Sequence, residues 1–196
     1  MIYSLIVLVM LGCTTKVPTP VQYKIDTQDV KSKVLNSECS DKSIKILPAY
    51  SSNTFLTTSM YYVEDKNKIY AYTKSKWATS PNSMITQYFE SLLKDMQLYK
   101  YVINSKSRAV SDLVLEIKID DFMQYYSKDY KKSYVKVILS LNIIDVKKAK
   151  VIKSAKYTKT LDATPLDASG GVDALKSALD DISKQSYEFF KGGCKW

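Results

Sequence analysis

The chain has 196 residues, of which 45% are hydrophobic and 25% charged, with only five glycines and five prolines. This length and composition are typical of one globular domain with short appendages, and they exclude a disordered, collagen-like or rod-shaped chain. The formal net charge is +9, yet Arg108 is the only arginine among 29 basic residues. Because nucleic-acid readers rely on arginine for bidentate contacts, we expect no nucleic-acid partner.

The sequence contains no histidine, which excludes Ser-His and Cys-His nucleophilic pairs and histidine zinc sites. Gly170-Gly171 fits neither of the two common phosphate-binding glycine motifs, so we interpret the pair as a turn leading into a helix. Asp120-Asp121 and Asp180-Asp181 are neighbours in sequence, and neighbours point to different sides of a strand or helix. We therefore expect a protein that is not an enzyme, with no catalytic residue, metal or cofactor.

Residues 2–11 form an uncharged apolar run that is followed by Gly12 and Cys13. Ten residues are too few to cross a bilayer, which takes about 20. The run resembles a bacterial lipoprotein signal, in which a small residue precedes a cysteine that becomes lipid-modified; the alternative is an ordinary buried strand with a chance cysteine. We predict a signal peptide at 1–12, a lipidated N-terminus with an extended tether at 13–20, and a single domain at 21–196.

Acyl chains on Cys13 would hold the protein on a membrane effectively permanently. The next residue is Thr14, and an aspartate at this position retains many bacterial lipoproteins at the inner membrane. By resemblance, Thr14 predicts a lipid-anchored protein of the outer membrane that faces the periplasm.

The sequence of the first half of the domain predicts three extended segments and a helix. Residues 21–25 could form an edge strand, the segment 43–50 contains a strand that stops at Pro48, and residues 59–77 form a hairpin around Asp65-Lys66-Asn67. Ser80-Pro81 is a helix start, since serine caps helices and proline favours their first position. Apolar residues then recur at helical spacing to about Leu98.

The second half predicts a short strand, a three-stranded meander and a final helix. Apolar and polar residues alternate along 113–122, 134–145 and 151–161, which is typical of antiparallel strands with one buried face. A helix opens after Ser169-Gly170-Gly171 and ends at Gly192-Gly193. This order predicts an α+β fold, a two-layer sandwich of a mostly antiparallel sheet with two amphipathic helices packed on one face.

Two cysteines besides Cys13 remain, Cys39 and Cys194. An even number of cysteines in an oxidising compartment suggests a bridge, so we predict a Cys39–Cys194 disulfide; the alternative is two free thiols. Trp77, directly before the capped helix, is expected to close one end of the core.

A tyrosine- and lysine-rich loop joins the first two meander strands. Such a loop could form a partner surface or contact anionic lipid headgroups, and the alternative is an ordinary solvated loop. A second basic cluster at Lys147, Lys148, Lys150 and Lys153 falls at the opposite end of the sheet. The candidate partner-contact residues are Tyr125, Tyr126, Lys128, Tyr130, Lys131, Lys132 and Tyr134.

Short motifs in a fixed order add a family resemblance over about residues 21–191. They are Tyr23-Lys24-Ile25, Leu47-Pro48, the Tyr70, Tyr72, Trp77-Ala78 segment, Leu92-Leu93, the meander, and the alanines and leucines of 174–179. In this order they resemble the ABC-type transport auxiliary lipoprotein family. The chain departs from that family where Thr79 follows Trp77-Ala78 in place of glutamate.

The resemblance implies a non-catalytic outer-membrane lipoprotein that docks the periplasmic part of an MCE-type ABC lipid transport system. Its partners would be an MCE-domain protein, a permease and an ATPase, it could form a homo-oligomer, and its cargo would be phospholipid moving between membranes. The alternative is a stand-alone envelope lipoprotein that assists outer-membrane assembly or binds anionic cell-wall or glycolipid polymers.

Overall fold

The structure is a computed structural model that describes residues 18–26, 37–65 and 67–194. In these residues nine strands form one sheet, and three α-helices accompany it. The elements are β1 Val21–Tyr23, β2 Ser43–Ile46, β3 Tyr50–Ser51, the short 3-10 helix Asn53–Phe55, β4 Ser59–Glu64, β5 Lys68–Trp77, α1 Pro81–Met96, β6 Tyr101–Asn104, β7 Leu113–Tyr126, β8 Ser133–Asp145, β9 Lys150–Asp162, α2 Ala168–Gln185 and α3 Tyr187–Lys191.

The long strand β7 is the centre of the sheet. On one side it pairs antiparallel with β8, which pairs antiparallel with β9, so these three strands form the predicted meander. On its other side β7 pairs in turn with β2, β3 and β4, all parallel to it. β6 extends the sheet beyond β2, and β5 followed by β1 extends it beyond β4.

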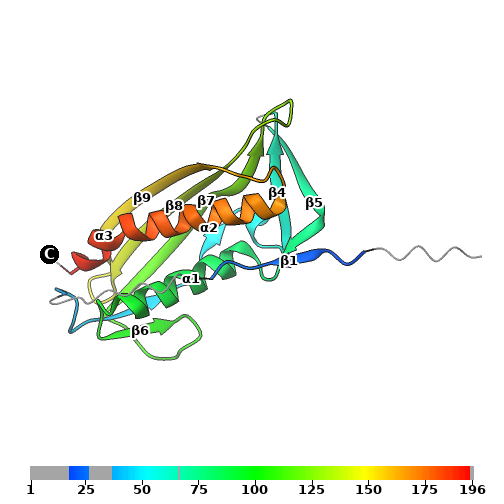
Figure 1. Ribbon diagram of the computed structural model, residues 1–196. Helices are drawn as coiled ribbons and strands as arrows, with labels where there is room; N and C mark the ends of the chain where they lie inside the picture. The colour runs from blue at the N-terminus through cyan, green and yellow to red at the C-terminus, as the bar shows by residue number, and fades with distance from the viewer. Residues whose placement is uncertain (1–17, 27–36, 66, 195–196) are drawn as a thin grey trace, which may run out of the picture.

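Both long helices cover the same face of the sheet, which we call the inner face (Figure 1). Alternating residues of β7 and β8, such as Leu115, Ile117 and Leu139, are buried there against Phe89 of α1 and Leu175 of α2. The other, outer face has no helix of the described residues packed on it (Figure 1). The predicted α+β two-layer sandwich is therefore confirmed, with short parallel ladders added to long antiparallel ones.

The structure corrects three predicted boundaries. β1 ends at Tyr23, two residues before the predicted edge strand does. The last helix begins at Ala168, capped by the Asp167 side chain, so Gly170-Gly171 lies inside its first turn rather than before it. At Gly170 the backbone of Pro165 approaches so closely that no Cβ would fit, which explains a glycine in a helix. The helix also breaks at Ser186, where α3 takes over.

Cys39 and Cys194 form a disulfide, with their Cα atoms 5.4 Å apart. The bridge lies where the chain before β2 meets the chain after α3, with Cys39 Sγ 3.9 Å from the carbonyl oxygen of the buried Phe190. We call this part of the molecule the closed end. Cys13 and the rest of the predicted signal peptide lie outside the described residues.

Trp77 is 3% exposed and its ring lies 5.9 Å from that of Phe122, so this tryptophan is part of the core. None of the helices in the part of the chain that the structure describes is both long enough and apolar enough to span a membrane.

Candidate contact surface at the sheet tip

Two turns meet at the end of the sheet farthest from the disulfide. β4 runs parallel to β7, with Tyr62 opposite Gln124 and Glu64 opposite Tyr126. Because both strands end here, the β4–β5 turn lies beside the loop between β7 and β8, at the upper right of Figure 1. We call this region the tyrosine tip, and it comprises Tyr62, Tyr70, Tyr72, Tyr126 and Tyr130 with Lys128, Lys131 and Lys132.

The five tyrosine rings form one connected cluster. Tyr62 lies at its centre, with ring centroids 5.8 Å from Tyr70, 4.6 Å from Tyr72 and 5.5 Å from Tyr126. Tyr130 joins through Tyr126, at 5.7 Å. Tyr70 and Tyr130 remain 44% and 51% exposed, so the cluster offers aromatic surface to a partner.

A buried amide fixes the base of the cluster. The Tyr72 hydroxyl donates to Gln124 Oε1 at 2.8 Å and lies 2.7 Å from the Tyr126 hydroxyl. Gln124 Nε2 donates to Ser133 Oγ at 2.6 Å and to the Asp167 carbonyl at 3.1 Å. The amide thus ties the rings to β8 and to the start of α2, and the tip is held in one arrangement before any partner arrives.

Tyr130 has a positive φ of 55°, a left-handed conformation that costs a non-glycine residue about 1 kcal/mol. Its hydroxyl interacts with Glu64, and this hydrogen bond raises the pKa of Tyr130 to about 12. Burial also raises the pKa of Tyr72 and of Tyr126. These three hydroxyls are therefore protonated and neutral at physiological pH. A strained residue held at an exposed position suggests a function for Tyr130.

The structure divides the predicted contact residues between two faces. Tyr126 and Tyr130 belong to the cluster, whereas Tyr125 and Tyr134 stack on each other on the outer face, with centroids 5.1 Å apart. The predicted lysines Lys128, Lys131 and Lys132 are exposed in the loop. None of the three ammonium groups lies within 4 Å of a carboxylate among the described residues.

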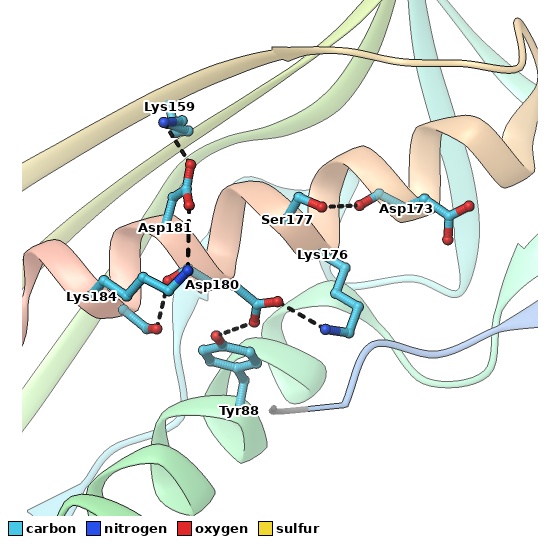
Figure 2. Close-up of polar contacts among 9 residues, drawn as sticks. Tyr88, Lys159, Asp173, Lys176, Ser177, Asp180, Asp181 and Lys184 are labelled. Atoms are coloured by element: carbon cyan, nitrogen blue, oxygen red, sulfur yellow. Dashed lines mark hydrogen bonds and ion pairs between the residues drawn. The ribbon is translucent and has the colours of Figure 1, made fainter. Parts of the chain in front are cut away.

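The acidic pair of α2 is separated as predicted (Figure 2). Asp180 accepts a 2.8 Å hydrogen bond from the Tyr88 hydroxyl of α1 and pairs with Lys176 one turn earlier on α2. Asp181 faces β9 and pairs with Lys159 at 2.6 Å. The two carboxylates therefore bind α2 to two different elements, which is a structural role.

The same prediction is wrong for Asp120-Asp121. A β-bulge inserts Asp120 as an extra residue, so that both side chains lie on the outer face. Asp120 interacts with Lys118 and Ser140, and Asp121 accepts a 2.6 Å hydrogen bond from Tyr125. The hydrogen bond from Lys118 lowers the pKa of Asp120, whereas burial raises the pKa of Asp121. The second oxygen of Asp121 is shielded from solvent, so a substrate does not reach it.

No group of three or more Cys, Asp or Glu side chains with the spacing of a metal site occurs within residues 18–26, 37–65 and 67–194.

Three tyrosines of the tip, Tyr62, Tyr70 and Tyr72, were missed by the sequence prediction, as was Gln124. The signal for two of them is present, because Tyr70 and Tyr72 are two apart and so share a face of their strand. Nothing local indicates that this face meets β7, because that contact depends on the parallel pairing of β4 with β7.

Comparison with known proteins identifies the fold. The sequence matches no family model, and no curated protein matches it. The structure is similar to protein XCC0632 from Xanthomonas campestris, of the family designated DUF330, with a TM-score of 0.70 and 13% identity over 88% of this chain and 93% of that one. A solved uncharacterized protein matches with a TM-score of 0.63 and 10% identity, over 85% of this chain and 99% of that one.

A third structure, the lipoprotein GNA1162 from Neisseria meningitidis, matches with a TM-score of only 0.39 and 11% identity, over 72% of this chain and 98% of that one. A similarity this weak supports no inference about the chain. The first two matches show that the protein has the fold of the DUF330 structure, and at 10–13% identity they show nothing beyond the fold.

These findings correct the family prediction. The motifs predicted an ABC-type transport auxiliary lipoprotein, but no family model matches the chain, and neither of the two proteins that share its fold is described in those terms. The motifs mark positions of this fold, such as the buried Trp77 and the apolar face of α2, and short patterns of buried residues do not by themselves identify a family.

Proposed function

We propose that the protein is a non-catalytic lipoprotein of the bacterial envelope, anchored through Cys13 in the outer membrane and facing the periplasm. The observation that carries the proposal is the tyrosine tip, an exposed and preorganised contact surface with lysines that pair with no described carboxylate. The disulfide adds support, since such bridges persist in oxidising compartments. The apolar run before Cys13 supports export.

The more specific proposal is that this lipoprotein docks the periplasmic part of an MCE-type ABC lipid transport system. The MCE-domain protein, permease and ATPase would be separate chains, and the cargo would be phospholipid. A subunit of this kind needs a fixed attachment to its membrane and a rigid surface for its partner. Long antiparallel ladders and a covalently closed end provide that rigidity.

The test is to isolate the lipidated full-length protein from membranes after mild crosslinking and to identify its partners by mass spectrometry. We expect to recover an MCE-domain protein together with its permease and ATPase. Recovery of only cell-wall or unrelated outer-membrane components would overturn the docking proposal and favour a stand-alone lipoprotein. The exposed lysines of the tip would suit that alternative, because their ammonium groups attract anionic polymers.

The anchor has its own test. Replacement of Cys13 by alanine should move the protein from the membrane fraction to the soluble fraction, and the intact mass of the wild-type N-terminal peptide should include acyl chains. An unmodified Cys13 in the wild-type protein would overturn the lipoprotein proposal.

A further inference from the structure

We propose that the tyrosine tip lies in the headgroup layer of the membrane that holds the protein's own anchor. This inference rests on the proposed lipidation of Cys13 and deepens that proposal, because it gives the domain an orientation on the membrane. The occupant of the tip is then the phospholipid headgroup layer, and the docking of an MCE-domain partner proposed above would use another face of the domain.

The register of the first strand sets how far the anchor lies from the tip. β1 pairs with the end of β5, with Val21 opposite Ser75, whereas β5 begins at the tip with Lys68. Ser75 lies seven positions after Lys68 on β5, a path of about 23 Å. The eight residues from Cys13 to the start of β1 span at most about 28 Å when extended. The tether is therefore long enough to bring the acyl chains level with the tip.

The two features also lie at the same end of the molecule. β1 and the tip are both on the right of Figure 1, whereas the C-terminus lies on the left. An anchor close to β1 holds the tip near the bilayer and keeps the closed end away from it. With so short a tether, the closed end does not reach the same membrane without the domain turning over.

The side chains of the tip suit a headgroup layer. Tyrosine concentrates at membrane interfaces because its ring is apolar and its hydroxyl is polar, and Tyr70 and Tyr130 expose about half of their surface. Ile69, 53% exposed, adds an apolar side chain at the same turn. Lys128, Lys131 and Lys132 supply positive charge, which attracts anionic headgroups.

The carboxylates of the tip are already engaged within the protein. Asp65 pairs with Lys68 at 3.7 Å, and Asp129 accepts hydrogen bonds from Ser127 Oγ at 2.7 Å and from the Lys131 backbone at 3.3 Å. Glu64 interacts with the hydroxyl of Tyr130. The four described lysines of the two turns, Lys68, Lys128, Lys131 and Lys132, outnumber the three carboxylates Glu64, Asp65 and Asp129, so the tip keeps a small positive charge that favours a membrane containing phosphatidylglycerol.

The test measures which lysines the membrane protects. The full-length lipidated protein is placed in vesicles of phosphatidylethanolamine with a minority of phosphatidylglycerol, labelled briefly with an amine-reactive acetylating reagent, and analysed by mass spectrometry. Lys147 and Lys150, exposed at the opposite end of the sheet, are the internal control. We expect Lys128, Lys131 and Lys132 to react several-fold more slowly than this pair, with most of the difference lost in vesicles of phosphatidylcholine alone.

A matched pair of variants links the protection to the rings. The double variant Tyr70→Ser, Tyr130→Ser should abolish most of the protection, whereas Tyr101→Ser, at a 60% exposed tyrosine on β6, should leave it unchanged. Equal labelling at the two ends of an acylated protein would overturn the inference and leave the lipoprotein proposal intact. A protein without acyl chains on Cys13 would overturn both. Protection that appears only when a protein partner is added would also overturn the inference.

Discussion

The two ends of the sheet are built differently. At the closed end a disulfide joins Cys39 to Cys194, and Phe190 is fully buried beside it. At the tyrosine tip the chain is held by hydroxyl and amide hydrogen bonds around Gln124, and Tyr70 and Tyr130 stay exposed. The closed end is held by covalent and apolar contacts that are complete within the protein. The tip uses preorganised polar contacts and leaves its outermost rings uncovered.

This difference assigns stability mainly to the closed end and contact with other molecules mainly to the tip. A surface that meets a partner has to stay solvated until the partner arrives, so it contributes little burial to folding. A covalent bridge that closes a loop of 155 residues compensates by restricting the unfolded chain. Substitutions at the closed end should therefore change the free energy of unfolding most. Substitutions of exposed tip residues should instead change how tightly the tip binds the surface that it contacts.

The largest expected effect comes from breaking the bridge. Replacing Cys39 by alanine should lower the free energy of unfolding by about 4 kcal/mol, because the unfolded chain regains the entropy of a long loop. The shift is read from the denaturation midpoint in guanidinium chloride. Wild-type protein in reductant should show a similar shift, and a midpoint insensitive to reductant would contradict the prediction.

A smaller effect is expected at the base of the tip. Gln124→Leu should cost about 2 kcal/mol, since it removes the hydrogen bonds that the buried amide makes with the Tyr72 hydroxyl, the Ser133 hydroxyl and the Asp167 carbonyl. Near-ultraviolet circular dichroism, which reports tyrosine environments, should change as well. The control is Tyr70→Ser, an exposed position, which should alter stability by less than about 0.5 kcal/mol.

The hydrogen bond that joins α1 to α2 should contribute less to the free energy of unfolding than the hydrogen bonds of Gln124 do. Tyr88→Phe removes the 2.8 Å hydrogen bond to buried Asp180 and should cost about 1 kcal/mol in thermal or chemical unfolding (Figure 2). Tyr134→Phe is the matched control, because its half-exposed ring stacks on Tyr125 and its hydroxyl has no hydrogen bond to another described residue. Equal losses in the two variants would argue against a specific role for the Tyr88 hydroxyl.

The smallest effect is a pH dependence. Burial raises the pKa of Asp121, so the folded protein binds this proton more tightly than the unfolded chain does. Protonated Asp121 therefore stabilises the fold fully at pH values below the ordinary pKa of an aspartate. This stabilisation is lost as pH rises through the raised pKa of Asp121. Asp121→Asn should therefore gain stability relative to wild type as pH rises from the acid range to neutral pH.

Asp181→Asn should change in the opposite direction. The hydrogen bond from Lys159 lowers the pKa of Asp181, so its contribution is present at neutral pH and is lost as pH falls through the lowered value. This variant should be less stable than wild type at neutral pH and approach it in acid, with unfolding curves at several pH values as the measurement. If the stabilities of the two variants changed in the same direction with pH, Asp121 and Asp181 would not differ as described.

The sequence by itself determined the elements that depend on local periodicity. Alternation along β7, β8 and β9 and helical spacing along α1 and α2 predicted the strands, the helices and the α+β class, because burial of one face imposes the period of each element. Cys39 and Cys194 were paired correctly because they are the only two cysteines in the predicted domain.

Tertiary structure alone decided the tip. The parallel pairing of β4 with β7 brings Tyr62 to Tyr126 across more than sixty residues, and no local pattern encodes that register. The bulge at Asp120 likewise moves Asp121 to the outer face, because one extra residue reverses the side on which the following residues lie. Periodicity fixes which face of an element is buried, whereas the relative placement of elements depends on how all of them pack together.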